Sequence, residues 1–430
     1  MSSPYQRKIT ISAGEECTLS GSCVVGLQLL SGVVEVAGVL LKAKEPPTFR
    51  LLTDRYSLVM YTLEGGCVLA TSTKQFEVSK AATGMASVGQ LCRGALATVT
   101  RSKVLVIGRR ASGKTLTAHT ICNILREDAS AVELGAASTS VFLMDLNAES
   151  NSIYAPGCIS TVLVEHILWP DTSASPTLLP FSLFVGETAP PGNESVASFL
   201  SFVEQLNECT DALIGAANTE RAHVVIDAPS PQEGVMEGVY FRRLVELLRP
   251  THVVMVSTQG ESDLCSNVLQ EDIQRVLPEC DVSYVAPVSQ RCNSSVREQR
   301  LCGYFSGNPQ CPLACAKIVL PLAQVQFVRY VRSESGVTCS KVTPSATIIG
   351  CICAVSHAEV IEEVPLAPIA GLLLLFAIDE EHEELVAVVP ASEPLPRRFL
   401  ILPNEPTRSC PPSALFSGEV AAHVEEAVAI

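Results

Sequence analysis

The pattern of apolar and polar positions changes character twice along the chain. Up to about residue 95, short β-branched runs such as 33–39 and 56–62 are separated by glycine turns such as Glu64-Gly65-Gly66. Closely spaced short runs of this kind predict a small all-β domain. From about 96 the runs alternate with helix-like segments, and after about 310 the chain returns to strands.

The middle region predicts an α/β fold. Its strand candidates alternate with segments of helical character, which favours a mostly parallel sheet with helices on both faces. The strand candidates are 103–107, 141–145, 222–227 and 251–257, and the helix candidates include 195–206 and 237–248. Later strand candidates are 316–320, 326–331, 346–355, 372–378 and 385–389. We therefore expect an N-terminal β domain (1–95), a central α/β domain (96–310) and a C-terminal β domain (311–430) with a flexible end after Pro403.

A phosphate-binding loop lies between the first central strand and the helix after it. The chain reads Gly-Arg-Arg-Ala-Ser-Gly-Lys-Thr, which satisfies GxxxxGK[ST] in full. In such a loop the backbone amides and the helix N-terminus face phosphate oxygens. Lys114 then reaches the β and γ phosphates, and the Thr115 hydroxyl holds Mg²⁺. We expect eight residues to bind nucleotide: Gly108, Arg109, Arg110, Ala111, Ser112, Gly113, Lys114 and Thr115.

Carboxylates and arginines elsewhere in this domain are candidates for the rest of a phosphoryl-transfer site. Asp145 and Asp227 each end a buried strand and are candidate Mg²⁺ ligands, directly or through water. An aspartate that merely caps the next turn is the alternative for each. Arg297 and Arg300 are spaced i, i+3, with Arg291 nearby, and such arginines can cover a transferring phosphoryl group. From the residues by themselves, a solvated helix face paired with Glu298 is the preferred interpretation of the arginines.

Composition narrows the function classes. The net charge of −15 and 5% aromatic content argue against a nonspecific nucleic-acid binder or an extended base-stacking platform. The longest apolar run, 364–378, contains two prolines and falls short of the roughly 20 residues that a membrane helix needs. No secretory pattern opens the chain. The 17 cysteines are scattered, as expected for buried thiols in an intracellular protein with no membrane segment.

The order of these pieces resembles the polynucleotide 5′-hydroxyl kinase family, most closely its cleavage-factor (Clp-one) branch in pre-mRNA 3′-end processing. The stretches that carry the resemblance are 104–115, 145–147 with 156–160, 185–190 with Asn193, 296–300 with 304–307, and 394–400. The resemblance implies a P-loop NTPase domain with an arginine lid, flanked by β domains. It also implies ATP and Mg²⁺ as cofactors, adenine contacts in the N-terminal domain, and a nuclear location among the other subunits of the cleavage and polyadenylation complex.

Two departures from the family pattern bear on activity. Active members carry an aspartate base at the position of Asn147, and an amide cannot accept the proton as a carboxylate does. They also carry a tryptophan clamp where this chain reads Asp227-Ala-Pro-Ser-Pro231.

We therefore expect an ATP-binding scaffold with weak or no kinase activity. The alternative is an active ATP-dependent RNA 5′-hydroxyl kinase, with RNA 5′ ends as partners. In it Asp145 is the stand-in base, and Arg297 and Arg300 stabilise charge. An unrelated phosphate-loop ATPase is a third, weaker possibility.

Overall fold

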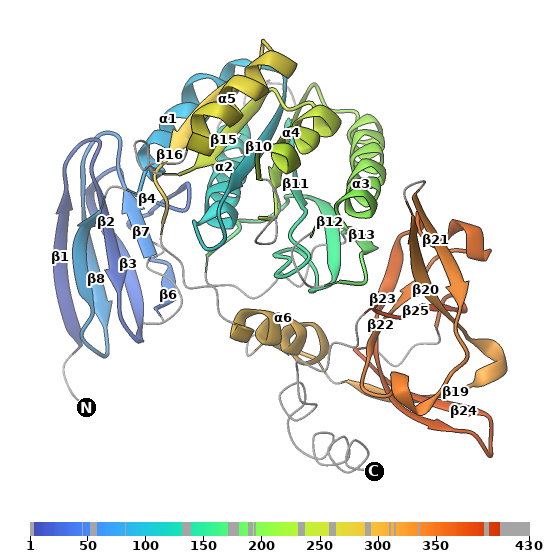
Figure 1. Cartoon of the computed structure of the whole chain (residues 1–430). Helices are drawn as coiled ribbons and strands as arrows, with labels where there is room; N and C mark the ends of the chain where they lie inside the picture. Colours follow the sequence, from blue (N-terminus) through green and yellow to red (C-terminus); the bar gives the residue numbers. More distant parts are fainter. Residues whose placement is uncertain are drawn as a thin grey trace.

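The structure, a computed structural model, is arranged as three parts in chain order. An N-terminal β region lies on one side of a central α/β layer, and a C-terminal β region lies on the other (Figure 1). The described residues are 4–44, 46–51, 58–81, 83–130, 139–170, 180–187, 192, 195–230, 237–257, 264–288, 294–308, 311–313, 315–333, 336–390 and 395–404. None of the helices described there is long and apolar enough to cross a membrane.

Two antiparallel sheets form the N-terminal region, in the orders β1-β8-β3-β6 and β5-β4-β7-β2-β9. The expected run 33–39 is broken because Ala37 and Gly38 both take positive φ (49° and 80°), which makes a two-residue hairpin turn. The strands are β1 (Tyr5–Ile11), β2 (Glu16–Ser20), β3 (Cys23–Gly32), β4 (Glu35–Val36), β5 (Val39–Leu40), β6 (Thr48–Leu51), β7 (Leu58–Tyr61), β8 (Gly66–Ser72) and β9 (Glu77–Ala81).

The central sheet is mostly parallel, as predicted, and runs β13-β12-β11-β14-β10-β15-β16. The first two strands pair antiparallel and were not predicted, and they extend the sheet beyond β11. The other five run parallel. Their bounds are β10 (Arg101–Gly108), β11 (Thr139–Asp145), β12 (Cys158–Leu163), β13 (Phe181–Phe184), β14 (Arg221–Asp227), β15 (His252–Val256) and β16 (Asp281–Val285).

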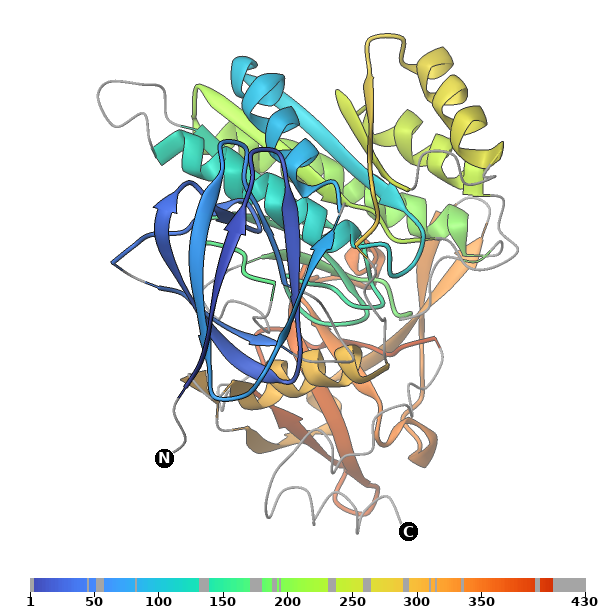
Figure 2. The ribbon, with the colours of Figure 1, turned by 90° about the vertical axis from the view of Figure 1, so that its left-hand side faces the viewer.

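Helices cover both faces of this sheet, as expected (Figure 2). Alternate residues of β10 point to opposite faces, so Val104 and Val106 join a core with α1, α2 and the N-terminal sheets. Leu105 and Ile107 join the core on the other face, with α3, α4 and α5. The bounds are α1 (Met85–Gly94), α2 (Lys114–Ser130), α3 (Val196–Ala217), α4 (Glu237–Leu248) and α5 (Leu264–Val276).

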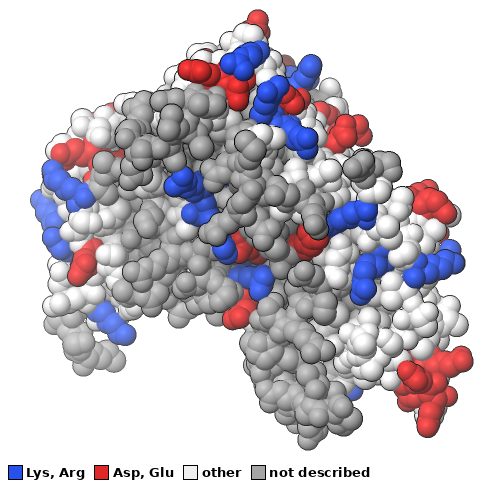
Figure 3. All heavy atoms as spheres, viewed as in Figure 1, with Lys and Arg blue, Asp and Glu red and all other residues white. Residues whose placement is uncertain are grey.

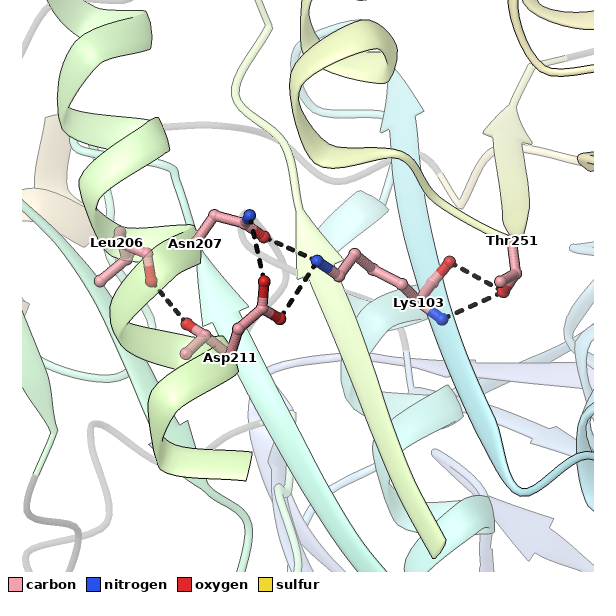
Figure 4. Close-up of polar contacts among 6 residues, drawn as sticks. Lys103, Leu206, Asn207, Asp211 and Thr251 are labelled. Atoms are coloured by element: carbon pink, nitrogen blue, oxygen red, sulfur yellow. Dashed lines mark hydrogen bonds and ion pairs between the residues drawn. The ribbon is translucent and has the colours of Figure 1, made fainter. Parts of the chain in front are cut away.

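A polar cluster around Lys103 fixes α3 at the start of β10, the end of the strand that lies away from the phosphate loop (Figure 4). The Lys103 Nζ donates to Asn207 Oδ1 at 2.7 Å and lies 3.4 Å from Asp211 Oδ1. The Thr251 amide donates to the Lys103 carbonyl at 2.8 Å, which ties in the start of β15. Because the Lys103 side chain is only 18% exposed, these partners replace much of its hydration.

The C-terminal region is a sheet of order β19-β24-β23-β22-β25-β20-β21. The expected strand 346–355 is partly wrong: residues 346–348 form a 3₁₀ turn, Gly350 reverses the chain with φ 83°, and the strand begins at Ile352. The expected flexible end after Pro403 lies almost wholly outside the described residues. The strands are β19 (Ala316–Pro321), β20 (Gln326–Ser333), β21 (Gly336–Lys341), β22 (Ile352–Ser356), β23 (Ile369–Asp379), β24 (Glu384–Val389) and β25 (Phe399–Ile401).

A short helix, α6 (Ser294–Ser306), lies between the two β regions and precedes a small hairpin of β17 (Gly307–Asn308) and β18 (Cys311–Pro312) (Figures 1 and 2). One face of the C-terminal sheet shares the core of the α3 side, and the other face has a core of its own. The domain boundaries near residues 95 and 310 remain a prediction. At the first of them, α1 packs against α2.

Candidate nucleotide-binding site

The eight predicted residues form one tight loop between β10 and α2. Ala111 and Gly113 both take positive φ, 61° and 95°, so the backbone curls in a way that favours glycine. A Cβ atom on Gly113 would meet Val288 O at 3.1 Å and Val288 Cβ at 3.2 Å. The Val288 amide donates to Ser112 O at 3.0 Å, which seals this contact. The segment after β16 therefore forms one wall of the loop.

Lys114 lies across the mouth of the loop. Its Nζ donates to the carbonyl of Arg109 and to Ser230 Oγ, both at 2.8 Å, and the residue is 7% exposed. Ser230 in turn donates to Gly108 O at 3.0 Å. Sequence reasoning missed Ser230, although its place three residues after Asp227 was a usable signal. This placement is compatible with the predicted contact between the ammonium group and phosphate oxygens.

Thr115 and Asp227 meet at the start of α2. The Thr115 hydroxyl donates to Asp227 Oδ2 at 2.6 Å. Asp227 is 1% exposed, and its Oδ1 atom has no hydrogen-bond partner among the residues that the structure describes. A buried carboxylate oxygen without a donor, next to a threonine hydroxyl, is a donor set that suits Mg²⁺. The residues present therefore fit the predicted metal.

Asp145 lies beside Asp227, because the two are register partners at the ends of β11 and β14. Both are buried, and burial together with the neighbouring charge of Asp145 raises the pKa of the Asp227 carboxyl. Burial also raises the pKa of Asp145, against the effect of its hydrogen bonds. Two adjacent buried carboxylates repel each other, so either a bound cation neutralises their charge or one carboxyl group keeps its proton.

The hydrogen bonds of Asp145 come from its own loop. Asn147 N donates to Oδ1 at 2.9 Å, while Ser152 N and Ser152 Oγ donate to Oδ2 at 2.5 Å and 2.6 Å. The Asn147 side chain donates to Ser150 Oγ at 3.0 Å. Asp145 therefore organises the loop after β11, and both of its oxygens are already engaged. This geometry favours the capping alternative for Asp145 over a free base.

Arg300 lies within range of the charges of Asp145 and Asp227 but forms no ion pair with either of them. Arg300 Nη1 donates to Asn151 O at 2.9 Å, and its Nε is buried without a partner among the described residues. Both carboxylates raise the pKa of the guanidinium, although its burial outweighs them and the pKa is lowered overall. Arg297 lies one turn earlier on α6 and is partly buried. Arg291 lies outside the described residues.

Two residues beside the site, His119 and Glu149, were not predicted. His119 on α2 lies 3.1 Å from Ser152 Oγ through its Nε2 atom, and burial lowers its pKa to about 3, so the ring is neutral. Arg110, one of the eight residues predicted to bind nucleotide, turns outward and pairs with Glu149 of the β11–β12 loop. These residues surround the phosphate loop on the side of β11. Their positions come from tertiary packing and gave no local signal in the sequence.

Some predicted features cannot be placed. Pro231, which marks the missing tryptophan clamp, lies outside the described residues, as do 188–190 and Asn193 of the resemblance. Val185 and Gly186 are described, and both carbonyls accept hydrogen bonds from the C-terminal region, from Arg332 Nη2 and from the Asn404 amide respectively. This part of the motif therefore joins the central domain to the C-terminal sheet.

Two family models match the chain in consecutive stretches. One, described as the P-loop of mRNA cleavage and polyadenylation factor CLP1, matches residues 108–307, the whole region of the site. The other, described as pre-mRNA cleavage complex II protein Clp1, matches residues 295–405. Together they run over well more than half of the chain and meet at α6. The chain belongs to the Clp1 family.

Full-length relatives within the Clp1 family are distant in sequence. A protein CLP1 homolog of Nematostella vectensis is 24% identical over 70% of this chain and 70% of its own length. A polyribonucleotide 5′-hydroxyl-kinase Clp1 of Rattus norvegicus is 24% identical over 88% of this chain and 90% of its own. A Danio rerio protein of the same name is 23% identical over 88% of each chain. The P-loop of this kinase family implies nucleotide binding.

Solved Clp1 structures share the fold. The structure of a wild-type Clp1p–Pcf11p complex matches with a TM-score of 0.71 and 17% identity, over 94% of this chain and 98% of the solved one. A second structure, of an extended Pcf11p–Clp1p interface, matches with a TM-score of 0.69. Both agree with the predicted arrangement of a P-loop domain between two β domains.

Proposed function

We propose that this Clp1 family member is an ATP-binding subunit of the nuclear pre-mRNA cleavage and polyadenylation machinery, and that it retains ATP as a structural ligand with weak or no kinase activity. The expectation of weak or no kinase activity rests on the hydrogen bonding of Asp145. Both of its oxygens accept hydrogen bonds from its own loop. The family resemblance places Asn147 at the position of the base. The residues that would bind phosphate lie together. On the acceptor side, the described residues Asp145 and Asn147 offer no carboxylate that is free of hydrogen bonds.

The phosphate loop would hold ATP with Mg²⁺. The loop amides and Lys114 would bind the phosphates, and Thr115 and Asp227 would ligate the metal. A bound Mg²⁺ supplies positive charge that lets two adjacent buried carboxyl groups ionise together. Among the described residues, Asp227 Oδ1, Arg300 Nε and the Ser112 Oγ of the phosphate loop are buried polar atoms without hydrogen-bond partners. A bound metal ion would bond to the carboxylate oxygen, and triphosphate oxygens would accept hydrogen bonds from the donors.

Retained ATP would stabilise the arrangement of domains by mass action. The loop that binds it is walled by Val288, and α2 is packed against the N-terminal hairpin at Gly38. A ligand bound here would therefore contact α2, the helix that packs against the N-terminal β region.

We further propose that the chain assembles with another subunit of the complex, as Clp1p does with Pcf11p in the solved complexes. On the face in Figure 3, basic and acidic side chains of the described surface are interspersed, without one continuous basic track for RNA.

An active polynucleotide 5′-hydroxyl kinase is the second candidate. The observation that favours it is Arg300, whose guanidinium is bound to Asn151 O and lies within range of the charges of Asp145 and Asp227, from where it would reach a transferring phosphoryl group. The rat and zebrafish relatives carry the kinase name. In this alternative Asp145 must release a loop hydrogen bond before it can accept the proton of an RNA 5′-hydroxyl, and Arg297 and Arg300 stabilise the developing charge.

The proposal is tested on the purified full-length chain by releasing its nucleotide with acid and identifying it. We expect about one ATP per chain, and we expect Lys114→Ala to lose it along with thermal stability and with binding to its Pcf11-like subunit. Lys8→Ala is the matched control, because it removes an exposed lysine of β1 in the N-terminal sheet, away from the phosphate loop. Retention of ATP, stability and assembly by Lys114→Ala would overturn the structural role.

A further inference from the structure

One side chain of the helix that carries Arg300 forms a hydrogen bond to the C-terminal sheet. Tyr304 lies four residues after Arg300 on α6, on the same face of the helix. Its hydroxyl accepts a hydrogen bond from the Leu372 amide of β23 at 2.7 Å. A Cβ atom on Gly371 would come within 3.0 Å of that hydroxyl, so the glycine leaves room for the contact. The Tyr304 hydroxyl therefore packs directly against the backbone of β23 at Gly371 and Leu372.

The same hydroxyl also reaches the loop of the nucleotide site. Its oxygen is 3.3 Å from the Tyr154 hydroxyl, and because it accepts from Leu372, its own hydrogen is available to Tyr154. The two rings meet edge to face, with centroids 5.3 Å apart. Tyr154 lies at the end of the β11–β12 loop, whose earlier residues bind Asp145. Tyr304 therefore bridges the C-terminal sheet and the loop of the site.

Arg300 and Tyr304 hold the two ends of one short segment, 151–154. Arg300 Nη1 donates to Asn151 O at 2.9 Å, and Tyr304 meets Tyr154. The segment itself is rigid, because the fully buried Asn151 side chain accepts from the amides of Ile153 and Tyr154 at 2.9 Å and 2.8 Å and donates to Cys158 O. A shift of α6 would therefore move the guanidinium relative to Asp145.

We propose that Tyr304 is a positioning residue for nucleotide retention: it holds α6 against β23 and segment 151–154 so that Arg300 stays beside the carboxylates, where the terminal phosphate would lie. The inference rests on the proposed nucleotide binding and adds a route by which the C-terminal sheet sets how long the nucleotide stays. Tyr304 touches neither the phosphate loop nor its carboxylates and acts through Arg300. A displacement of β23 would be transmitted to the site through the Leu372–Tyr304 hydrogen bond.

The test measures dissociation of fluorescent ATP and ADP analogues from the full-length protein, chased by unlabelled nucleotide. Tyr304→Phe leaves the Leu372 amide without its acceptor, and we expect ATP to leave about fivefold faster. ADP should change much less, because it lacks the phosphate that Arg300 faces. Tyr154→Phe is the matched control, since it keeps the Leu372 bond, and it should have a smaller effect. In an Arg300→Ala background, Tyr304→Phe should add nothing, because the two residues act as one unit.

Several results would overturn the inference. These are an unchanged ATP dissociation rate in Tyr304→Phe, equal acceleration of ATP and ADP, or full additivity with Arg300→Ala. If Tyr304→Phe does not fold, Gly371→Ala replaces it, because its added methyl group pushes on the hydroxyl without removing it, and the same ATP-selective acceleration is required. Failure of the wild-type protein to bind the ATP analogue would refute the proposed function itself, which is a separate result.

Discussion

Asp145 and Asp227 are register partners on neighbouring parallel strands, so two buried carboxyl groups end side by side below the phosphate loop. Their hydrogen bonding differs sharply. Asp145 receives donors from Asn147 and Ser152, whereas Asp227 receives the Thr115 hydroxyl on one oxygen and leaves the other without a described partner. One carboxylate is therefore committed to its loop and the other is available to a cation.

Replacing Asp227 should separate metal binding from stability. We expect Asp227→Asn to reduce ATP affinity at least tenfold in Mg²⁺ and to change it little in EDTA, because the metal ligand is lost while the loop remains. The nucleotide-free variant should be as stable as wild type or more so, since an amide carries no buried charge. Calorimetric titration with and without Mg²⁺ measures the first effect, and thermal unfolding measures the second. Equal losses of affinity in Mg²⁺ and in EDTA would contradict the assigned role.

Restoring a carboxylate at position 147 should test what blocks phosphoryl transfer. If the amide is the obstacle, Asn147→Asp should raise phosphorylation of a 5′-hydroxyl RNA by at least tenfold, within the range that a general base contributes. Asn147→Ala is the control, because it removes the amide without adding a base. A rise in both variants would point to the loop, and no rise in Asn147→Asp would show that the amide is not what limits transfer.

His119 should make stability depend on pH in a defined window. Its pKa is lowered to about 3 by burial, so the folded protein keeps the ring neutral while the unfolded chain takes up a proton near its ordinary value of 6.5. The unfolded state then binds more protons between those values, and stability falls as the pH drops from about 6.5 towards 3. His119→Gln should lose stability less steeply than wild type over that window. Parallel curves of unfolding free energy against pH would count against the prediction.

Asn123 should be a major support of the domain arrangement. This buried residue of α2 donates to Ala37 O at 2.8 Å and to Leu168 O at 3.0 Å, and accepts from Leu168 N at 2.9 Å. Asn123→Ala would leave these groups unpaired and should cost about 2–4 kcal/mol of unfolding free energy. Thr120→Val on the same helix removes a hydroxyl bonded within α2 and should cost about 1 kcal/mol. Denaturant unfolding of both variants distinguishes them, and equal losses would be unexpected.

The sequence predicts the strand and helix that hold the phosphate loop, because β10 and α2 are strongly patterned and the motif fixes their junction. It also places Asp145 and Asp227 at strand ends, and parallel pairing then brings them together. Strand β12 was missed, since Cys-Ile-Ser-Thr-Val-Leu lacks a clear alternation and its role depends on pairing with β11.

The details of the site depended on contacts that no local pattern reveals. Ser230 reaches Lys114 from 116 positions away, and Tyr304 reaches Leu372 from 68. The hydrogen bonds to both oxygens of Asp145 follow from the path of the loop after β11, and they favour a loop-capping role for that residue over the predicted base. The spacing of Arg297 and Arg300 did not show which of them faces the carboxylates, because that depends on how α6 docks.

The fate of the γ phosphate tests the central claim most directly. The full-length protein is loaded with ATP labelled at the γ phosphate and incubated with an excess of 5′-hydroxyl RNA, and the label is then separated as ATP, free phosphate and RNA. We predict that the label stays in protein-bound ATP throughout the incubation. Label transferred to the RNA 5′ end by the wild-type protein, and not by Lys114→Ala, would contradict retention and establish the kinase.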